Sequence, residues 1–178
     1  MLFRSAAVLA RRLPAFVTPV LLFVNASADA VVRAGERVPG AWLQFHGDES
    51  PEFCARTAQR AGAPYIRAAR IPRDDAASFD LVKYALDYSS AQALLLDTLV
   101  PGYGGGGHTF NWSQLPPSVN CHLVLSGGLT PANVADGLRA LRARGRSLSV
   151  DVSSGVESAK GIKDPAKMQA FIQAVRQA

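Results

Sequence analysis

Six short, mostly apolar segments recur along the chain, and the stretches between them are long enough for helices. The segments lie about 25 residues apart. They cover residues 16–24, 41–45, 65–69, 93–97, 122–126 and 148–152. Their apolar residues run continuously instead of alternating, which is typical of parallel strands that are covered on both faces. The pattern therefore predicts a series of strand–helix repeats.

Helix starts are marked in these intervals by a small polar residue followed by proline. Such a residue caps free backbone amides, and proline suits the first helical turn. The pairs Ser50-Pro51, Thr130-Pro131 and Asp164-Pro165 carry this signature, and Ser27 marks a weaker start. Residues 6–13 predict a helix with no strand before it.

Six strands with a following helix each, preceded by one further helix, are most of a (β/α)8 barrel. The predicted fold class is α/β, an incomplete TIM barrel with six of its eight parallel strands. A complete barrel would need on the order of 50 more residues at the N-terminus. We expect residues 6–178 to form a single domain and residues 1–5 to lie outside the repeat.

Two of the last strands run into turns of very small residues. Gly127 and Gly128 follow one strand, and Ser154 and Gly155 follow the next, with Asp151 beside them. Small side chains let backbone N–H groups approach an anion, and late turns of this kind hold phosphate in barrels. The alternative is a pair of tight strand-to-helix turns without a ligand.

Two polar residues stand at carboxyl ends of strands, the end at which barrel active sites form. Asp97 is the best-placed acid for donating a proton, although an aspartate there can also cap a loop. His46 is a candidate for substrate contact, although it can also bind a neighbouring loop.

The glycine-rich residues 102–107 match the dinucleotide pattern G-x-G-x-x-G. A dinucleotide turn opens directly into a helix, which this sequence does not do, and His108 stands where a phosphate-binding P-loop needs lysine. We expect a mobile lid over the pocket instead.

The net charge of +5 favours an anionic partner. The arginines are scattered and no nucleic-acid motif occurs, so a small phosphorylated molecule is favoured over nucleic acid. Two cysteines without ligand spacing predict neither a disulfide framework nor a metal site. Pro14 and Pro19 interrupt the first apolar run, so we expect a cytoplasmic protein without a signal peptide or membrane partner.

Several motifs together resemble the phosphoribosylanthranilate isomerase family, in order and spacing, from about Ala6 to the C-terminus. They are Leu43-Gln44-Phe45-His46-Gly47-Asp48-Glu49, Leu95-Leu96-Asp97-Thr98, Gly102-Tyr103-Gly104-Gly105, Leu125-Ser126-Gly127-Gly128-Leu129, Val150-Asp151-Val152-Ser153-Ser154-Gly155-Val156-Glu157 and Gly161-Ile162-Lys163-Asp164-Pro165. The resemblance implies an Amadori rearrangement in tryptophan biosynthesis that needs no cofactor. It also implies Asp97 as general acid, His46 and Asp151 as substrate contacts, and phosphate at the two glycine turns.

The resemblance leaves the general base without a counterpart. In the family this base is a cysteine on the first strand, whereas Cys54 falls in a predicted helix and Cys121 before a predicted strand. An arginine that the family places after its second strand is also missing. We therefore expect a truncated gene product that lacks the first two strands and has impaired activity. A non-catalytic sugar-phosphate binding module, or another phosphate-binding barrel enzyme such as indole-glycerol-phosphate synthase, remains the alternative.

Overall fold

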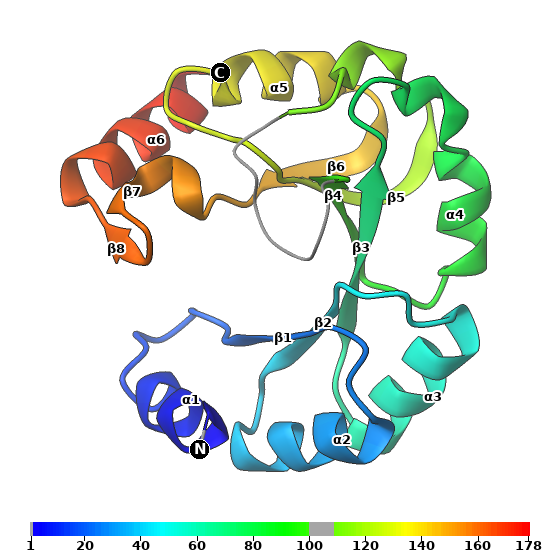
Figure 1. Ribbon diagram of the computed structural model, residues 1–178, viewed down its shortest axis with the longest axis vertical. Helices are drawn as coiled ribbons and strands as arrows, with labels where there is room; N and C mark the ends of the chain where they lie inside the picture. Colours follow the sequence, from blue (N-terminus) through cyan, green and yellow to red (C-terminus); the bar gives the residue numbers. More distant parts are fainter. Residues whose placement is uncertain (1, 100–108) are drawn as a thin grey trace. The chain divides into compact units, whose positions relative to one another are not determined.

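Six parallel strands form one sheet in the order β1-β2-β3-β4-β5-β6 (Figure 1). The computed structural model describes residues 2–99 and 109–178. The strands are β1 (Val20–Phe23), β2 (Trp42–Phe45), β3 (Tyr65–Ile71), β4 (Ala93–Thr98), β5 (Val119–Leu125) and β6 (Gly145–Val150). Every predicted strand is present, and the predicted α/β fold with six parallel strands in sequence order is confirmed. A short antiparallel hairpin, β7 (Glu157–Ala159) and β8 (Ile162–Lys163), was not predicted.

The starts of β1, β5 and β6 each differ by at least three residues from the sequence prediction. Residues 14–17 form a turn in which Val17 N–H donates to Pro14 O, and Phe16 has a positive φ of 68°. The first strand therefore begins only at Val20. The fifth strand begins earlier than expected, at Val119, so Cys121 lies inside β5 and not before it.

The helices are α1 (Leu2–Ala10), α2 (Ala28–Arg37), α3 (Pro51–Ala61), α4 (Leu81–Asp87), α5 (Val134–Leu141) and α6 (Pro165–Gln177), with 3-10 turns η1 (Ala76–Ser78), η2 (Trp112–Gln114) and η3 (Ser154–Val156). The N-caps predicted at Ser27, Ser50 and Asp164 each accept a backbone hydrogen bond. The start predicted at Thr130 is wrong, because α5 begins at Val134. Residues between them form a turn in which Asn133 Oδ1 accepts from Thr130 N–H.

The chain divides into two compact units, residues 1–68 with 88–92 and residues 69–87 with 93–178. In the first unit, α2 and α3 lie on the same side of β1 and β2 (Figure 1). Its core centres on Phe45, whose ring packs edge-on against Phe53 and Tyr65. Val31 and Leu43 are also fully buried there.

In the second unit, the core lies between β4, β5 and α5. Leu94, Leu95 and Leu96 are consecutive and all at most 2% exposed, so β4 is covered on both faces. Leu123 and Leu125 of β5 are fully buried beside them. The continuous apolar pattern therefore identified this strand correctly. No helix in residues 2–99 and 109–178 is long and apolar enough to cross a membrane.

Candidate active site

The first glycine turn, residues 126–129, follows β5 and packs against the end of β4. Gly127 has φ of 74°, and a Cβ there would lie 2.7 Å from Asp97 Oδ1 and from Thr98 N. Asp97 is half-buried, and its Oδ1 accepts from Thr98 N–H at 2.9 Å. The absence of a side chain at Gly127 thus lets the turn come into contact with the predicted acid.

The second glycine turn, residues 152–155, follows β6 and touches the first. A Cβ on Gly155 would lie 1.8 Å from Leu129 O, so the two backbones are in direct contact. Asp151, just before this turn, accepts a 3.0 Å hydrogen bond from Ser126 Oγ. Contact of two small-residue turns at the carboxyl ends of neighbouring strands is the arrangement that holds phosphate in barrels.

Two residues that sequence reasoning did not select hold these turns in place. Asn133 Nδ2 donates to Gly128 O at 3.0 Å, which ties the first turn to the start of α5. Lys163 Nζ donates to Ser153 O and to Glu157 Oε1, both at 2.8 Å. The hydrogen bond from Lys163 lowers the pKa of the Glu157 carboxyl. Lys163 belongs to one of the motifs that carry the family resemblance, but the sequence analysis gave it no role. No local sequence pattern singled out Asn133.

Most of the predicted site residues lie together in the second unit. Asp97, Asp151, Gly127, Gly128, Ser154 and Gly155 all belong to the ends of β4, β5 and β6 or to the turns that follow. Residues 102–107, the predicted lid, lie outside the described residues. Within the part of the chain that the structure describes, no group of three or more potential ligands could hold a metal ion.

His46 belongs to the first unit, where it follows β2. The imidazole is half-buried, and its backbone N–H donates to Phe23 O at 2.8 Å. Its Nδ1 lies 3.1 Å from Nε2 of Gln44, two residues earlier on the strand. The sequence analysis considered a histidine that binds a neighbouring loop, whereas this partner lies on β2 itself.

The turn after His46 is held by a buried ion pair between Glu49 and Arg67, whose side chains are 3% and 5% exposed. Glu49 Oε2 accepts from Gly47 N–H at 2.9 Å and from Arg67 Nη1 at 3.0 Å, and its Oε1 accepts from Asn25 N–H at 2.7 Å. Arg67 also donates to Gly47 O, and its guanidinium stacks on the Tyr88 ring. These contacts hold the backbone of the turn in place.

Neither cysteine has the environment of a catalytic base. Cys54 lies in α3 and is fully buried, and this burial raises the pKa of its thiol to about 12. Cys121 lies in β5, where burial also raises the thiol pKa. A thiol acts as a base or nucleophile through its thiolate, which both environments disfavour.

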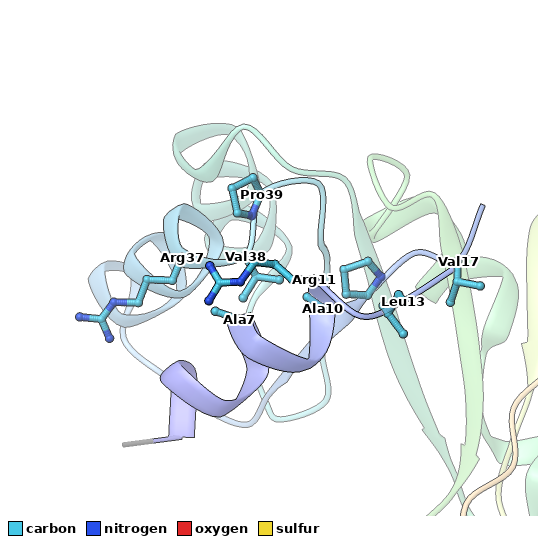
Figure 2. Close-up of a pocket in the computed structure, with 9 residues that line it drawn as sticks. Ala7, Ala10, Arg11, Leu13, Val17, Arg37, Val38 and Pro39 are labelled. Carbon is cyan, nitrogen blue, oxygen red and sulfur yellow. The ribbon is translucent and has the colours of Figure 1, made fainter. Parts of the chain in front are cut away.

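A pocket of about 450 Å³ lies between α1 and the turn that follows α2 (Figure 2). Figure 2 shows Ala7 and Ala10 on one side and Val38 and Pro39 on the other, with Arg37 pointing away. The pocket is next to Pro19, before β1 begins, so it lies at the amino ends of β1 and β2. Active sites of barrels form at the opposite ends of the strands.

Parallel strand–helix units in sequence order, with small-residue turns at the carboxyl ends of late strands, are typical of α/β-barrel enzymes. The sequence profile of N-(5'phosphoribosyl)anthranilate (PRA) isomerase matches residues 4–174. The chain therefore belongs to the PRA isomerase family, a family of isomerases of tryptophan biosynthesis.

Individual relatives agree with the family match. The chain is 57% identical to the N-(5'-phosphoribosyl)anthranilate isomerase of Leptothrix cholodnii, covering 97% of this chain and 73% of that protein. It is 54% identical to the isomerase of Methylibium petroleiphilum, covering 97% and 76%. The solved isomerase of Thermotoga maritima is similar with a TM-score of 0.77 and 32% identity, covering 99% of this chain and 81% of that one.

Proposed function

We propose that the two glycine turns bind the phosphate of N-(5-phosphoribosyl)anthranilate through Gly127, Gly128, Ser154 and Gly155. The contact of Gly155 with Leu129 O is the observation that carries this proposal, because it brings both turns to one place. A solved PRA isomerase that is 30% identical, with a TM-score of 0.75, was crystallised with reduced 1-(o-carboxyphenylamino)-1-deoxyribulose 5-phosphate. That ligand carries the same phosphorylated end.

The proposed reaction converts the aminoaldose into an aminoketose without a cofactor. Asp97 protonates the ribose ring oxygen, and the ring opens to a Schiff base. A base then removes the proton from the adjacent carbon, and the resulting enolamine tautomerises to the ketone. One carbon is oxidised and its neighbour reduced, so no external oxidant or reductant is needed. His46 and Asp151 contact the substrate, and the Ser126 hydroxyl orients Asp151.

The base is proposed to lie on a strand that precedes the six described strands. This follows from the two cysteines, since the buried thiol of Cys54 and the strand position of Cys121 suit neither to the role. The first two strands of the family barrel would then be outside this 178-residue polypeptide. We expect the polypeptide by itself to bind ligand with little turnover.

Calorimetry and a rate assay on the 178-residue polypeptide test these proposals together. We expect reduced 1-(o-carboxyphenylamino)-1-deoxyribulose 5-phosphate to bind, turnover to be nearly absent, and added upstream strand–helix units to restore it. Near-normal turnover without those units would show that the general base lies within the 178 residues, which would contradict its assignment to a preceding strand. Failure of the ligand to bind would contradict the phosphate site itself.

The second candidate is a binding module, which the two unsuitable cysteines favour. The genomic DNA upstream of Met1 separates the candidates. An open frame that encodes a strand with cysteine supports the isomerase. An in-frame stop codon with no such strand supports the module.

A matched pair of variants tests the role of Asp97 once turnover is restored. Asp97→Asn keeps the shape but cannot donate the proton, so we expect kcat to fall about 10²- to 10⁴-fold with ligand binding retained. Asp136→Asn makes the same change on the exposed face of α5 and should leave kcat unaltered. Equal rates for the two variants would exclude Asp97 as the acid.

A further inference from the structure

Gln44 and His46 are two residues apart at the end of β2, so their side chains leave the same face of the sheet. Gln44 is only 9% exposed, which is unusual for a glutamine unless its amide has a partner. The partner is the imidazole of His46, with 3.1 Å between Gln44 Nε2 and His46 Nδ1. The buried amide therefore contacts one specific ring nitrogen.

The chemistry of the two groups fixes where the imidazole proton resides. An amide nitrogen only donates hydrogen bonds, so Nδ1 of His46 must accept with its lone pair. A neutral imidazole has one N–H, which is then on Nε2. We propose that Gln44 is a positioning residue that holds His46 as the neutral Nε2–H tautomer.

The backbone around His46 is held by contacts with neighbouring segments. His46 N–H is bonded to Phe23 O on the neighbouring strand. The next residue, Gly47, donates its N–H to Glu49 and accepts from Arg67. A Cβ on Gly47 would lie 2.3 Å from Asn25 Oδ1, so this turn is closely packed. The backbone that carries the imidazole is thus held by hydrogen bonds and close packing.

This inference deepens the proposed function and rests on it for its consequence. With Nδ1 occupied by the amide proton and Nε2 protonated, neutral His46 has no lone pair available for taking a proton from the substrate. It serves as a hydrogen-bond donor to a substrate oxygen. His46 therefore does not replace the cysteine base.

Nitrogen-15 NMR on the labelled 178-residue polypeptide tests the tautomer without requiring turnover. The spectra are recorded above the usual titration range of imidazole. We expect His46 to show a protonated Nε2, an unprotonated Nδ1, and a coupling across the hydrogen bond to the Gln44 side-chain nitrogen. A protonated Nδ1 in the unaltered protein would overturn the proposal.

Two substitutions at Gln44 show whether that residue sets the tautomer. In Gln44→Glu, a carboxylate that accepts hydrogen bonds should draw the proton to Nδ1. In Gln44→Met, which has similar length and no donor, the ring should become a mixture of tautomers and the coupling should vanish. Gln59→Glu, on the exposed side of α3, is the matched control and should match the unaltered protein. A ring that stays wholly Nε2–H in Gln44→Met contradicts the role of Gln44, whether or not Gln44→Glu folds.

Titration with reduced 1-(o-carboxyphenylamino)-1-deoxyribulose 5-phosphate separates this inference from the proposed function. We expect Gln44→Glu to weaken binding about tenfold, the usual effect of losing one hydrogen bond. No binding by the unaltered protein, with the tautomer as expected, would contradict the proposed function and leave the Gln44–His46 assignment intact. Equal binding by Gln44→Glu with a reversed tautomer would overturn the donor role of His46.

Discussion

At the scale of single residues, Gly155 is constrained by what touches it. A Cβ at this position would overlap Leu129 O at 1.8 Å and approach Thr130 Cα at 3.2 Å. Both neighbours are backbone, so the two glycine turns would have to move apart. We expect Gly155→Ala to lower the free energy of unfolding by about 1–3 kcal/mol, as overpacking does, and to abolish phosphate-ligand binding.

Urea denaturation and calorimetry check this expectation against Gly35→Ala. A Cβ on Gly35 in α2 would meet only Ala61 Cβ at 3.8 Å, an ordinary contact. Alanine also favours a helix over glycine, so this control should raise stability by up to about 1 kcal/mol. If Gly155→Ala binds ligand as well as the control does, the contact between the turns is not part of the phosphate site.

Because of Cys54, we expect the free energy of unfolding to fall as pH rises into the alkaline range. Burial raises the pKa of its thiol to about 12, whereas a thiol in the unfolded chain titrates near 9. Between these values the unfolded state binds fewer protons than the folded state, so stability falls as pH rises. The stabilisation that the protonated Cys54 thiol contributes is fully present below about pH 9. Above that pH it is lost, by at most about 1.4 kcal/mol per pH unit.

Urea unfolding of the protein and of Cys54→Ala at pH 8, 9 and 10 isolates this thiol from other alkaline groups. The variant should be less stable at pH 8 because it leaves a small cavity. Its stability should then fall less steeply with pH than that of the unaltered protein. Parallel slopes would show that Cys54 titrates alike in the folded and unfolded states.

At the scale of elements, helix starts were predictable where the signal is local. Ser50 and Asp164 cap their own helices with their own side chains, so sequence alone identified them. Thr130 carried the same signal, but Asn133 bonds it into a turn, and the helix starts later. The two glycine turns were also predictable from local sequence, because small residues directly follow apolar strand segments. The Glu49–Arg67 pair joins residues far apart in sequence, and no local pattern reveals it.

The turn between β2 and α3 depends on that buried pair. Glu49→Gln removes the charge opposite Arg67 and places an amide NH2 among backbone donors from Asn25 and Gly47. Removing one charge of a buried ion pair is costly, so we expect the free energy of unfolding to fall by about 3–5 kcal/mol.

The matched control is Asp87→Asn, which breaks an exposed ion pair with Lys83 on α4. Exposed pairs contribute little, so the control should lose less than about 1 kcal/mol in the same urea experiment. A loss of that small size for Glu49→Gln would mean that the buried charges are balanced by other groups.

At the scale of the whole molecule, the division into two units raises the question of whether they unfold separately. The boundary falls inside β3, whose residues Tyr65 to Arg67 pair with β2 in the first unit. Ile71, at the other end of the strand, accepts from Leu99 N–H in the second unit. Unfolding either unit would therefore fray a strand that the other needs. We expect residues 6–178 to unfold as one domain in a single cooperative transition.

Calorimetry of variants with a change in one unit gives the decisive comparison. Glu49→Gln lies in the first unit and Gly155→Ala in the second. In a single domain, each substitution lowers the temperature of one transition that keeps the full cooperativity, with equal calorimetric and van't Hoff enthalpies. If Glu49→Gln shifts only part of the heat absorption and Gly155→Ala shifts the rest, the two units fold independently, and the glycine turns and His46 belong to separate domains.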